Sequence, residues 1–151
     1  MAGLTRRDIE RMIEEARQKR EQPNLSQRDL SHMGLFAADL SEVDLSQANL
    51  RRTTLSKANL RGANLSEATL TEAGLSQADL SGANLSRAYL FQAGLRAANL
   101  SGANLSEAYL NGADFSMADL SGVDLSQATY SDYTKWPVGF DPVKAGAIRR
   151  D

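Results

Sequence analysis

The sequence predicts an all-β solenoid, in which the chain turns after every five residues and closes one coil after four turns. Three observations carry this prediction. From Leu25 to Leu125 every fifth residue is leucine, with Phe115 as the one exception. Two residues before each leucine, from residue 38 on, the chain has alanine at all but three positions. A slower period is marked by glycines that lie twenty residues apart, at Gly62, Gly82, Gly102 and Gly122.

The five-residue period excludes the regular elements. On an α-helix five residues advance by about 500°, so successive leucines would lie about 140° apart and define no face. On a straight strand an odd period would send alternate leucines to opposite faces. Alanine and leucine within one unit are two residues apart and share a face when that unit is extended. A chain that turns in the same direction after each unit keeps both inside, as in a β-solenoid.

The twenty-residue period sets the number of sides. Twenty residues hold four five-residue units, which predicts a square cross-section with Ala and Leu along the axis. Residues 23–132 then make about five and a half coils, a prism about 25 Å long if stacked strands are about 4.8 Å apart.

The repeats resemble a known group. The run ANLSGANLSEAYL, residues 98–110, and its companions over residues 23–132 resemble the pentapeptide-repeat proteins. That resemblance implies a right-handed quadrilateral β-helix. The segment TKWPVGFDPVKAGA, residues 134–147, is similar to tails of pentapeptide-repeat proteins from cyanobacteria and related bacteria.

The chain divides into three segments, of which residues 1–22 are expected to form a capping helix at the first coil. Thr5 is a suitable N-cap, and Leu4 and Ile9 occupy the two positions of a hydrophobic staple. Pro23 ends the helix. Open strand edges at the ends of a solenoid need such covers. A plain cap and a helix that recruits a partner both fit this pattern.

Residues 23–132 form the predicted β-helix, and residues 133–151 a C-terminal capping tail. Four aromatic residues are expected to fold over the last coil, namely Tyr130, Tyr133, Trp136 and Phe140. A dimer contact through this end is the alternative. In the first coil Arg28 occupies the position that is alanine in later units. A charged residue there indicates that the interior of the terminal coil is open or in contact with water.

The composition argues against an enzyme and against cofactors. The 151 residues include no cysteine and one histidine, His32, so neither thiolate nor multi-histidine metal sites are expected. The Asp, Asn and Ser residues recur in fixed slots of the repeat, where short polar side chains hydrogen-bond the backbone at a turn. A catalytic carboxylate needs one special environment rather than the same one repeated. We therefore expect no catalytic residue, cofactor or metal.

Departures from the repeat mark the candidate surfaces. Tyr89, Phe91 and Tyr109 occupy outward slots in adjacent coils, and exposed aromatic side chains are enriched where proteins meet. These three residues are the predicted partner-binding patch; a cross-strand stack that only stabilises the coils is the alternative. The glycine column either supplies positive φ at corners or leaves a smooth strip for a close approach.

A second candidate is a basic cluster in one coil, formed by Arg51, Arg52, Lys57 and Arg61. It is suited to a phosphate or an acidic partner, although a solvated face explains it as well. Charges also alternate along columns of residues twenty apart, as in Glu67, Arg87 and Glu107, and Arg52 precedes Glu72 in another. Such exposed pairs favour the correct register between adjacent coils, but they are weak evidence of a function.

The function expected from these observations is a non-enzymatic scaffold that binds another protein. The resemblance implies an alternative, because some pentapeptide-repeat proteins imitate B-DNA and bind DNA gyrase, giving quinolone resistance. Those proteins are strongly acidic dimers with many central phenylalanines, whereas this chain has a net charge of -2 and one central phenylalanine. A purely structural or stress-related role stays open.

The remaining expectations concern surroundings and assembly. The net charge of the chain is close to zero, which argues against nucleic acid as a partner. No apolar run approaches the roughly 20 residues needed to span a bilayer, and the N-terminus lacks the apolar core of a secretory signal. We therefore expect no membrane partner, a cytoplasmic location, and either a monomer or an end-to-end homodimer.

Overall fold

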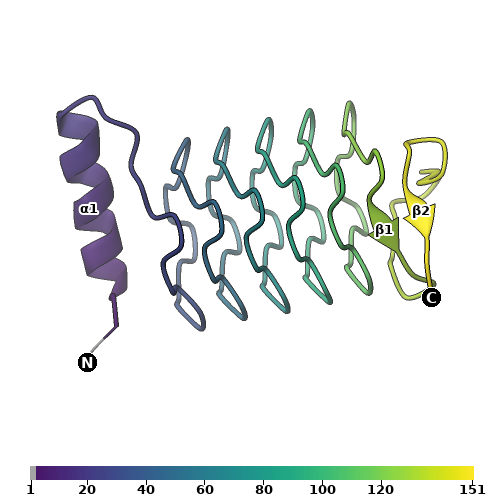
Figure 1. Ribbon diagram of the computed structural model, residues 1–151, viewed down its shortest axis with the longest axis horizontal. Helices are drawn as coiled ribbons and strands as arrows, with labels where there is room; N and C mark the ends of the chain where they lie inside the picture. Colours follow the sequence, from purple (N-terminus) through teal and green to yellow (C-terminus); the bar gives the residue numbers. More distant parts are fainter. Residues whose placement is uncertain (1–2) are drawn as a thin grey trace.

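The computed structural model describes residues 3–151, and it is built from stacked coils of twenty residues (Figure 1). Parallel β-bridges join residues twenty positions apart, from Asn24 with Asp44 to Tyr109 with Thr129. Each coil therefore holds four five-residue units, as the period predicts. The pairing is β throughout, but most of it occurs through single bridge residues. In the described chain, continuous strands are limited to β1 (Thr129–Tyr130) and β2 (Ile148–Arg149).

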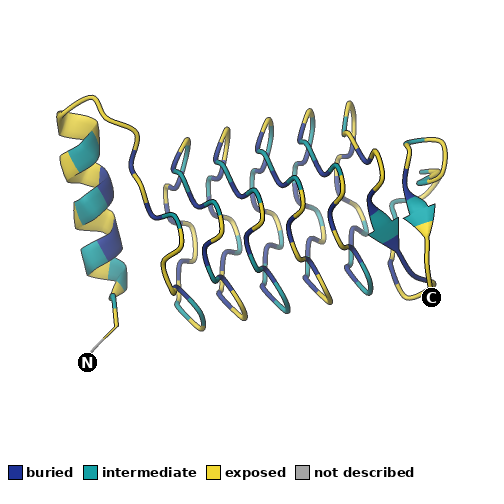
Figure 2. Ribbon diagram, viewed as in Figure 1, coloured by how far each residue is buried: buried dark blue, intermediate teal, exposed yellow. Residues whose placement is uncertain are grey.

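Each five-residue unit turns the chain by one tight corner. In the unit around Ala48, its N–H donates to the carbonyl of Leu45 over 3.1 Å, and Gln47 between them has a φ of 59°. A positive φ at the third residue alone is the mark of a type II turn. Leu45 and Ala48 are both fully buried, so the corner brings the leucine of one unit and the alanine of the next into the core (Figure 2).

Glycine is not required at these corners. Positive φ recurs at the equivalent residue of every unit, and most of these positions carry side chains, as Gln47 does. A Cβ built on Gly82 or Gly102 meets no atom within 4 Å. The glycine column thus has the positive φ that the sequence indicated, at corners that also accept other residues.

The polar residues of the repeat hold the corners. The Oδ1 of Asp44 accepts hydrogen bonds from the N–H and the hydroxyl of Ser46, at 3.0 and 2.7 Å. Asn64 accepts from the N–H of Ser66 in the same way, at 3.1 Å. These are the local side-chain to backbone contacts for which Asn, Asp and Ser are favoured in turns. The A-(D/N)-L-S pattern is therefore structural, with two buried and two corner-forming positions.

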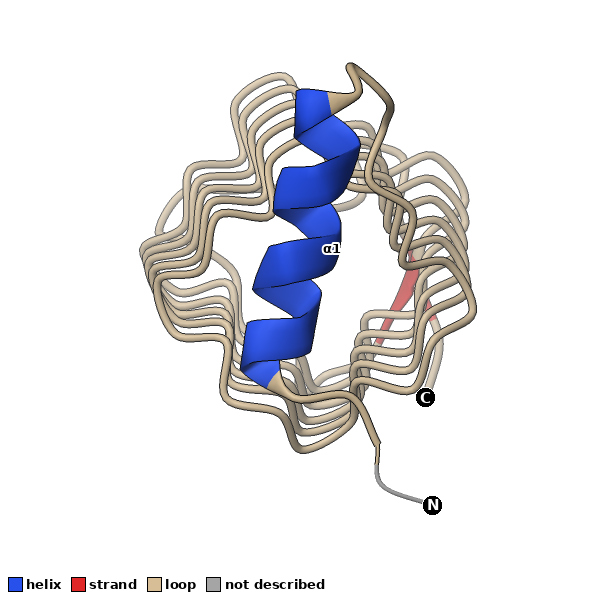
Figure 3. Cartoon of the chain, turned by 90° about the vertical axis from the view of Figure 1, so that its left-hand side faces the viewer, coloured by secondary structure: helices blue, strands red, loops and turns tan. Residues whose placement is uncertain are grey.

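The first coil is covered by α1 (Arg6–Gln18), which lies across the open end of the solenoid (Figure 3). Ile9 and Ile13 are buried against the core. Thr5 is the N-cap: its hydroxyl accepts from the N–H of Asp8 at 3.1 Å, and the Asp8 carboxylate accepts from the N–H of Thr5 at 2.9 Å. Residues 1 and 2 of the predicted capping segment lie outside the described residues.

Two arginines of α1 bind the edge of the first coil. Arg6 donates to the carbonyl of Phe36 at 2.8 Å, and Arg17 donates to the carbonyl of Ser41 at 2.9 Å. Arg17 also pairs with Asp39 at 3.1 Å. These contacts fix the helix over the core, because each satisfies a polar group at a different point of the rim.

The last coil is covered by a cluster of aromatic side chains. Trp136 stacks on Phe115 with a centroid distance of 5.1 Å, and Phe140 stacks on Trp136 at 5.3 Å. The ring of Tyr130 meets Trp136 edge-on at 5.5 Å. The strand β2 then pairs in parallel with β1. Three of the four aromatic residues expected here therefore lie together at this end.

The prediction for Tyr133 was wrong, because its side chain is 83% exposed. The cause is an insertion of one residue in the turn 131–134. Asp114 pairs with Lys135, twenty-one residues on, whereas the other bridges span twenty. The longer turn lifts Tyr133 outward, while the buried hydroxyl of Thr134 donates to the carbonyl of Leu110 at 2.9 Å.

Candidate binding surfaces

Tyr89 and Tyr109 form a stack on one side of the solenoid. Their rings lie 4.9 Å apart and within 5° of parallel, and each side chain belongs to a residue that is 45% exposed. The stack follows from the coil, since the two residues form a β-bridge one coil apart. Cross-strand aromatic pairs of this kind stabilise a sheet. Half of each residue nevertheless stays in contact with solvent.

Phe91 is exposed by a similar amount, 48%, but lies in the corner that follows Leu90. It borders a hollow of about 610 Å³ whose lining includes Asn111, Gly112 and Tyr133. Of the three residues in the predicted patch, Tyr89 and Tyr109 form the stack and Phe91 borders this hollow. Tyr133 belongs to the hollow, and sequence reasoning had assigned it to the cap.

The hollow has an ion pair on its rim. Arg149 of β2 donates to both carboxylate oxygens of Asp132, at 2.6 and 2.7 Å. The hydrogen bond from Arg149 and its positive charge hold the pKa of Asp132 below its usual value, and the same contact raises the pKa of Arg149. The hollow is thus bordered by Phe91, Tyr133 and Asp132, and the charge of Asp132 already has a partner in Arg149.

The four predicted basic residues are exposed but are distributed over three successive corners of one coil, at residues 51–52, 57 and 61. Arg52 pairs with Glu72 at 2.5 Å, which lowers the pKa of that carboxyl, and Arg61 lies 3.9 Å from Asp79. The predicted columns are also present in part, with Arg87 pairing with Glu107 at 3.2 Å. The four basic residues therefore lie at three different corners, and two of them face carboxylates.

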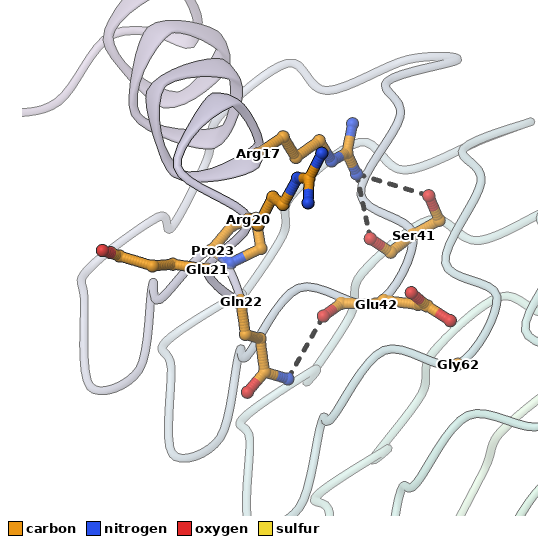
Figure 4. A pocket seen from close by; sticks show the side chains of 8 residues that line it. All are labelled: Arg17, Arg20, Glu21, Gln22, Pro23, Ser41, Glu42 and Gly62. Atoms are coloured by element: carbon orange, nitrogen blue, oxygen red, sulfur yellow. Dashed lines mark hydrogen bonds between the residues drawn. The ribbon is translucent and has the colours of Figure 1, made fainter.

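A polar hollow of about 550 Å³ lies where α1 meets the first coils (Figure 4). Arg17 and Arg20 border it from the end of the helix, and Glu42 borders it from the solenoid. Gln22 donates across it to the carbonyl of Glu42 at 3.2 Å. Its charged groups have both signs, so it favours no ligand class by charge.

The described residues form neither a metal-binding cluster nor a membrane-spanning helix. Over residues 3–151, no three His, Asp or Glu side chains are arranged to hold a metal ion. The helix α1 is shorter and more polar than a helix that crosses a bilayer, and the described part of the chain contains no other helix.

The repeats match the family model described as Pentapeptide repeats, with eight copies of the repeat. The matched ranges are residues 35–71, 48–87, 70–94 and 88–127. The chain belongs to the pentapeptide-repeat family. A right-handed quadrilateral β-helix is the fold that its pentapeptide-repeat neighbours imply. A search of curated protein sequences found no match.

Several solved structures of pentapeptide-repeat proteins are similar. Rfr23 of the cyanobacterium Cyanothece 51142 is 38% identical over 66% of this chain and 64% of its own, with a TM-score of 0.45. A protein of the Arabidopsis thaliana thylakoid lumen is 28% identical over 72% and 66%, with a TM-score of 0.51. This chain therefore spans slightly less than two thirds of either protein.

A third neighbour shares the fold at low identity. QnrB1, a plasmid-mediated fluoroquinolone resistance protein, has a TM-score of 0.56 at 16% identity, over 85% of this chain and 80% of its own. Identity this low supports the fold alone. Pentapeptide-repeat proteins are generally structural or interaction modules.

Proposed function

We propose that the protein is a non-enzymatic scaffold that binds another protein through Tyr89, Phe91 and Tyr109. The observation that carries the proposal is the exposure of these three residues, between 45 and 48%, on a solenoid whose other outward slots are mostly Ser, Asn, Gln and charged residues. Aromatic side chains with free surface are typical of the centres of protein interfaces. A cytoplasmic partner is expected.

Phe91 distinguishes this proposal from a purely structural role. Stacking gives Tyr89 and Tyr109 a stabilising contact of their own. Phe91 takes no part in the ring pairs found among the described residues, and it borders the corner hollow together with Tyr133. A large apolar side chain in that position gains most when another molecule covers it.

The test compares three purified baits in affinity capture from a host lysate. These are the wild type, the triple variant Tyr89→Ser, Phe91→Ser and Tyr109→Ser, and the control Phe36→Ser, which removes an exposed aromatic side chain from a corner of the first coil. Thermal unfolding first establishes that all three are folded. We expect one protein to be retained by the wild type and by the control and lost by the triple variant. Identical captures would contradict the proposal.

The gyrase-binding alternative has less support. DNA mimicry needs long faces of negative charge. In this chain, by contrast, charges of opposite sign alternate between corner residues twenty positions apart, as in the ion pairs of Arg52 with Glu72 and of Arg87 with Glu107. The discriminating measurement is DNA supercoiling by gyrase with and without the protein. Protection of gyrase from a quinolone, lost on removal of acidic residues, would favour the alternative.

A further inference from the structure

The last coil has an open β-edge along two of its four sides, residues 116–125. The chain leaves the coil path after Lys135, which lies over Asp114, and returns at Gly146, whose carbonyl accepts from the N–H of Gln127 at 3.0 Å. Between these points Trp136 and its neighbours cover the end of the core. In the described chain residues 116–125 pair with the coil before them, but no later segment pairs with their outer edge, so the next rung is absent there.

The unpaired backbone groups follow from the coil below. There the N–H of Leu100 donates to the carbonyl of Asp119 at 2.8 Å, and the N–H of Asp119 donates to the carbonyl of Ala98 at 2.9 Å. Within residues 3–151 the corresponding groups of the last coil have no such partner. The donors are the N–H groups of Met117, Leu120, Gly122 and Leu125, and the acceptors are the carbonyls of Ala118 and Val123.

Exposure along much of this edge agrees with the missing rung. Val123 is half-buried and Asp124 is exposed, whereas Ala103 and Asn104, one coil earlier, are buried and half-buried respectively. Ala118 and Leu120 are buried less completely than Ala98 and Leu100, but Leu125, next to Gly146, is fully buried. An edge with free donors, free acceptors and apolar side chains is a template for another strand.

We propose that the edge 116–125 captures an extended segment of a partner protein, which adds one further rung and carries basic residues at its two outward positions. The inference concerns a different surface from the aromatic residues and does not depend on them. The basic character follows from Asp119 and Asp124, which are exposed on this edge. A residue in the added rung would lie directly over each carboxylate, where an opposite charge is favourable and a like charge unfavourable.

Both carboxylates are held in the charged form. The hydroxyl of Ser121 lowers the pKa of Asp119, and the hydroxyl of Ser126 lowers the pKa of Asp124; a backbone hydrogen bond from the same serine adds to each effect. The edge therefore keeps its two negative charges at neutral pH.

A second copy of this chain fits the edge less well. Two-fold pairing of the same edges would bring Asp119 and Asp124 of one copy toward those of the other. Head-to-tail stacking is obstructed by α1, which lies across the first coil (Figure 3). Arg28 is also exposed there in an inward slot, and a charge in such a slot disfavours edge pairing.

The test uses a synthetic peptide that copies residues 96–105 with Asn99→Lys and Asn104→Lys. This segment is chosen because, in the protein, it pairs in the same way with the coil that precedes it. Hydrogen exchange of the full chain is followed by NMR, and we expect the peptide to protect the amides of the four donors. A peptide N-methylated at both lysines cannot donate to Ala118 and Val123, and we expect it to give no protection.

The charge requirement is tested on the protein with the double variant Asp119→Asn and Asp124→Asn. Asparagine occupies the same slot one coil earlier, at Asn99 and Asn104, where it keeps the corner hydrogen bonds to Ser101 and Ser106. Two exposed cross-strand charge pairs predict a loss of peptide affinity of about 2- to 30-fold. A peptide with Asp in place of both lysines should bind the wild type more weakly than the lysine peptide.

Four results would overturn the proposal. The first is an edge whose four amides are already protected in the free protein. The second is equal binding of the N-methylated peptide, and the third is no binding of the lysine peptide at millimolar concentration. The fourth is a dimer in sedimentation experiments whose formation protects the same amides, because the occupant would then be a second copy.

Discussion

The two ends of this solenoid are closed by different means. At the first coil a single amphipathic helix, α1, buries Ile9 and Ile13 over the core and binds rim carbonyls through arginine side chains. At the last coil a tail without a helix covers the core with stacked aromatic rings, and β2 pairs with the backbone of one side. Each end protects its apolar core, but only the second extends the ladder of backbone hydrogen bonds.

The comparison teaches that capping a solenoid involves two separate tasks. Covering the inward side chains removes apolar surface from water, whereas pairing the rim removes free backbone donors and acceptors. A helix can do the first task, but along its length it has no backbone groups to offer for the second, because only those at its ends lack an internal partner. A tail can do both, and here it leaves two sides of the last coil unpaired.

The largest expected effect tests whether the two ends belong to one cooperative unit. Leu85 is fully buried midway between them, so Leu85→Asp places a charge among apolar side chains and should abolish folding. We expect the helical signal of α1 in circular dichroism and the fluorescence of Trp136 to be lost together. Leu85→Met is the matched control and should remain folded. Survival of either signal alone would mean that the ends fold independently.

The next effect concerns the C-terminal cover. Trp136→Ala removes the ring that joins Phe115, Phe140 and Tyr130, and should lower the free energy of unfolding by about 3–5 kcal/mol. Trp136→Phe should cost clearly less, since the indole N–H is buried without a hydrogen-bond partner among the described residues. Urea unfolding measures both. Equal losses for the two variants would show that the stacked ring contributes little.

The N-terminal cover is expected to be slightly less sensitive. Ile9→Ala should lower the free energy of unfolding by about 2–5 kcal/mol, because Ile9 is fully buried on the side of α1 that packs on the core. Glu14→Ala, on the exposed side of the same helix, is the control and should change stability by less than about 0.5 kcal/mol. Chemical denaturation of both variants checks this. A larger loss for Ile9→Ala than for Trp136→Ala would reverse the comparison.

Much of the fold could be predicted from the sequence because the repeat fixes it locally. The leucine and glycine periods gave the coil of four units, and Thr5 gave the start of α1. Tyr133 could not be placed, since Ser131 and Asp132 continue the repeat and hide the extra residue that follows them. The arginine contacts from α1 to the first coil join residues more than twenty positions apart and leave no local pattern.

The candidate surfaces were predicted less well than the fold. The sequence places Phe91 next to the tyrosines, but the corner after Leu90 turns it toward the hollow with Tyr133. The dispersal of the basic residues could have been found, because Arg52 and Lys57 are five residues apart and therefore occupy successive corners. Proximity along a solenoid chain is thus a poor guide to a shared face, whereas a separation of twenty residues is a good one, as the stack of Tyr89 on Tyr109 shows.

The smallest effect separates the electrostatics of the two ends. Hydrogen bonds from the backbone and the hydroxyl of Thr5 lower the pKa of Asp8, whereas Arg149 lowers the pKa of Asp132 by a hydrogen bond and its charge. A lowered folded-state pKa stabilises the fold above the unfolded value, near 3.8, and this stabilisation is lost as the pH falls through the lowered value. Both carboxyls should therefore stabilise the protein at neutral pH and cease to do so in acid.

Salt distinguishes the two cases, because ions screen an exposed charge pair more than a hydrogen bond that a carboxylate accepts from a neighbouring backbone N–H. In NMR titrations at low and high salt, the pKa of Asp132 should rise toward its ordinary value as salt is added, and that of Asp8 should change less. Arg149→Gln is the matched variant and should raise the pKa of Asp132 at low salt while leaving Asp8 unchanged. An equal response of both carboxyls to salt would mean that Arg11, which lies 3.1 Å from Asp8, matters at the first end as much as Arg149 does at the last.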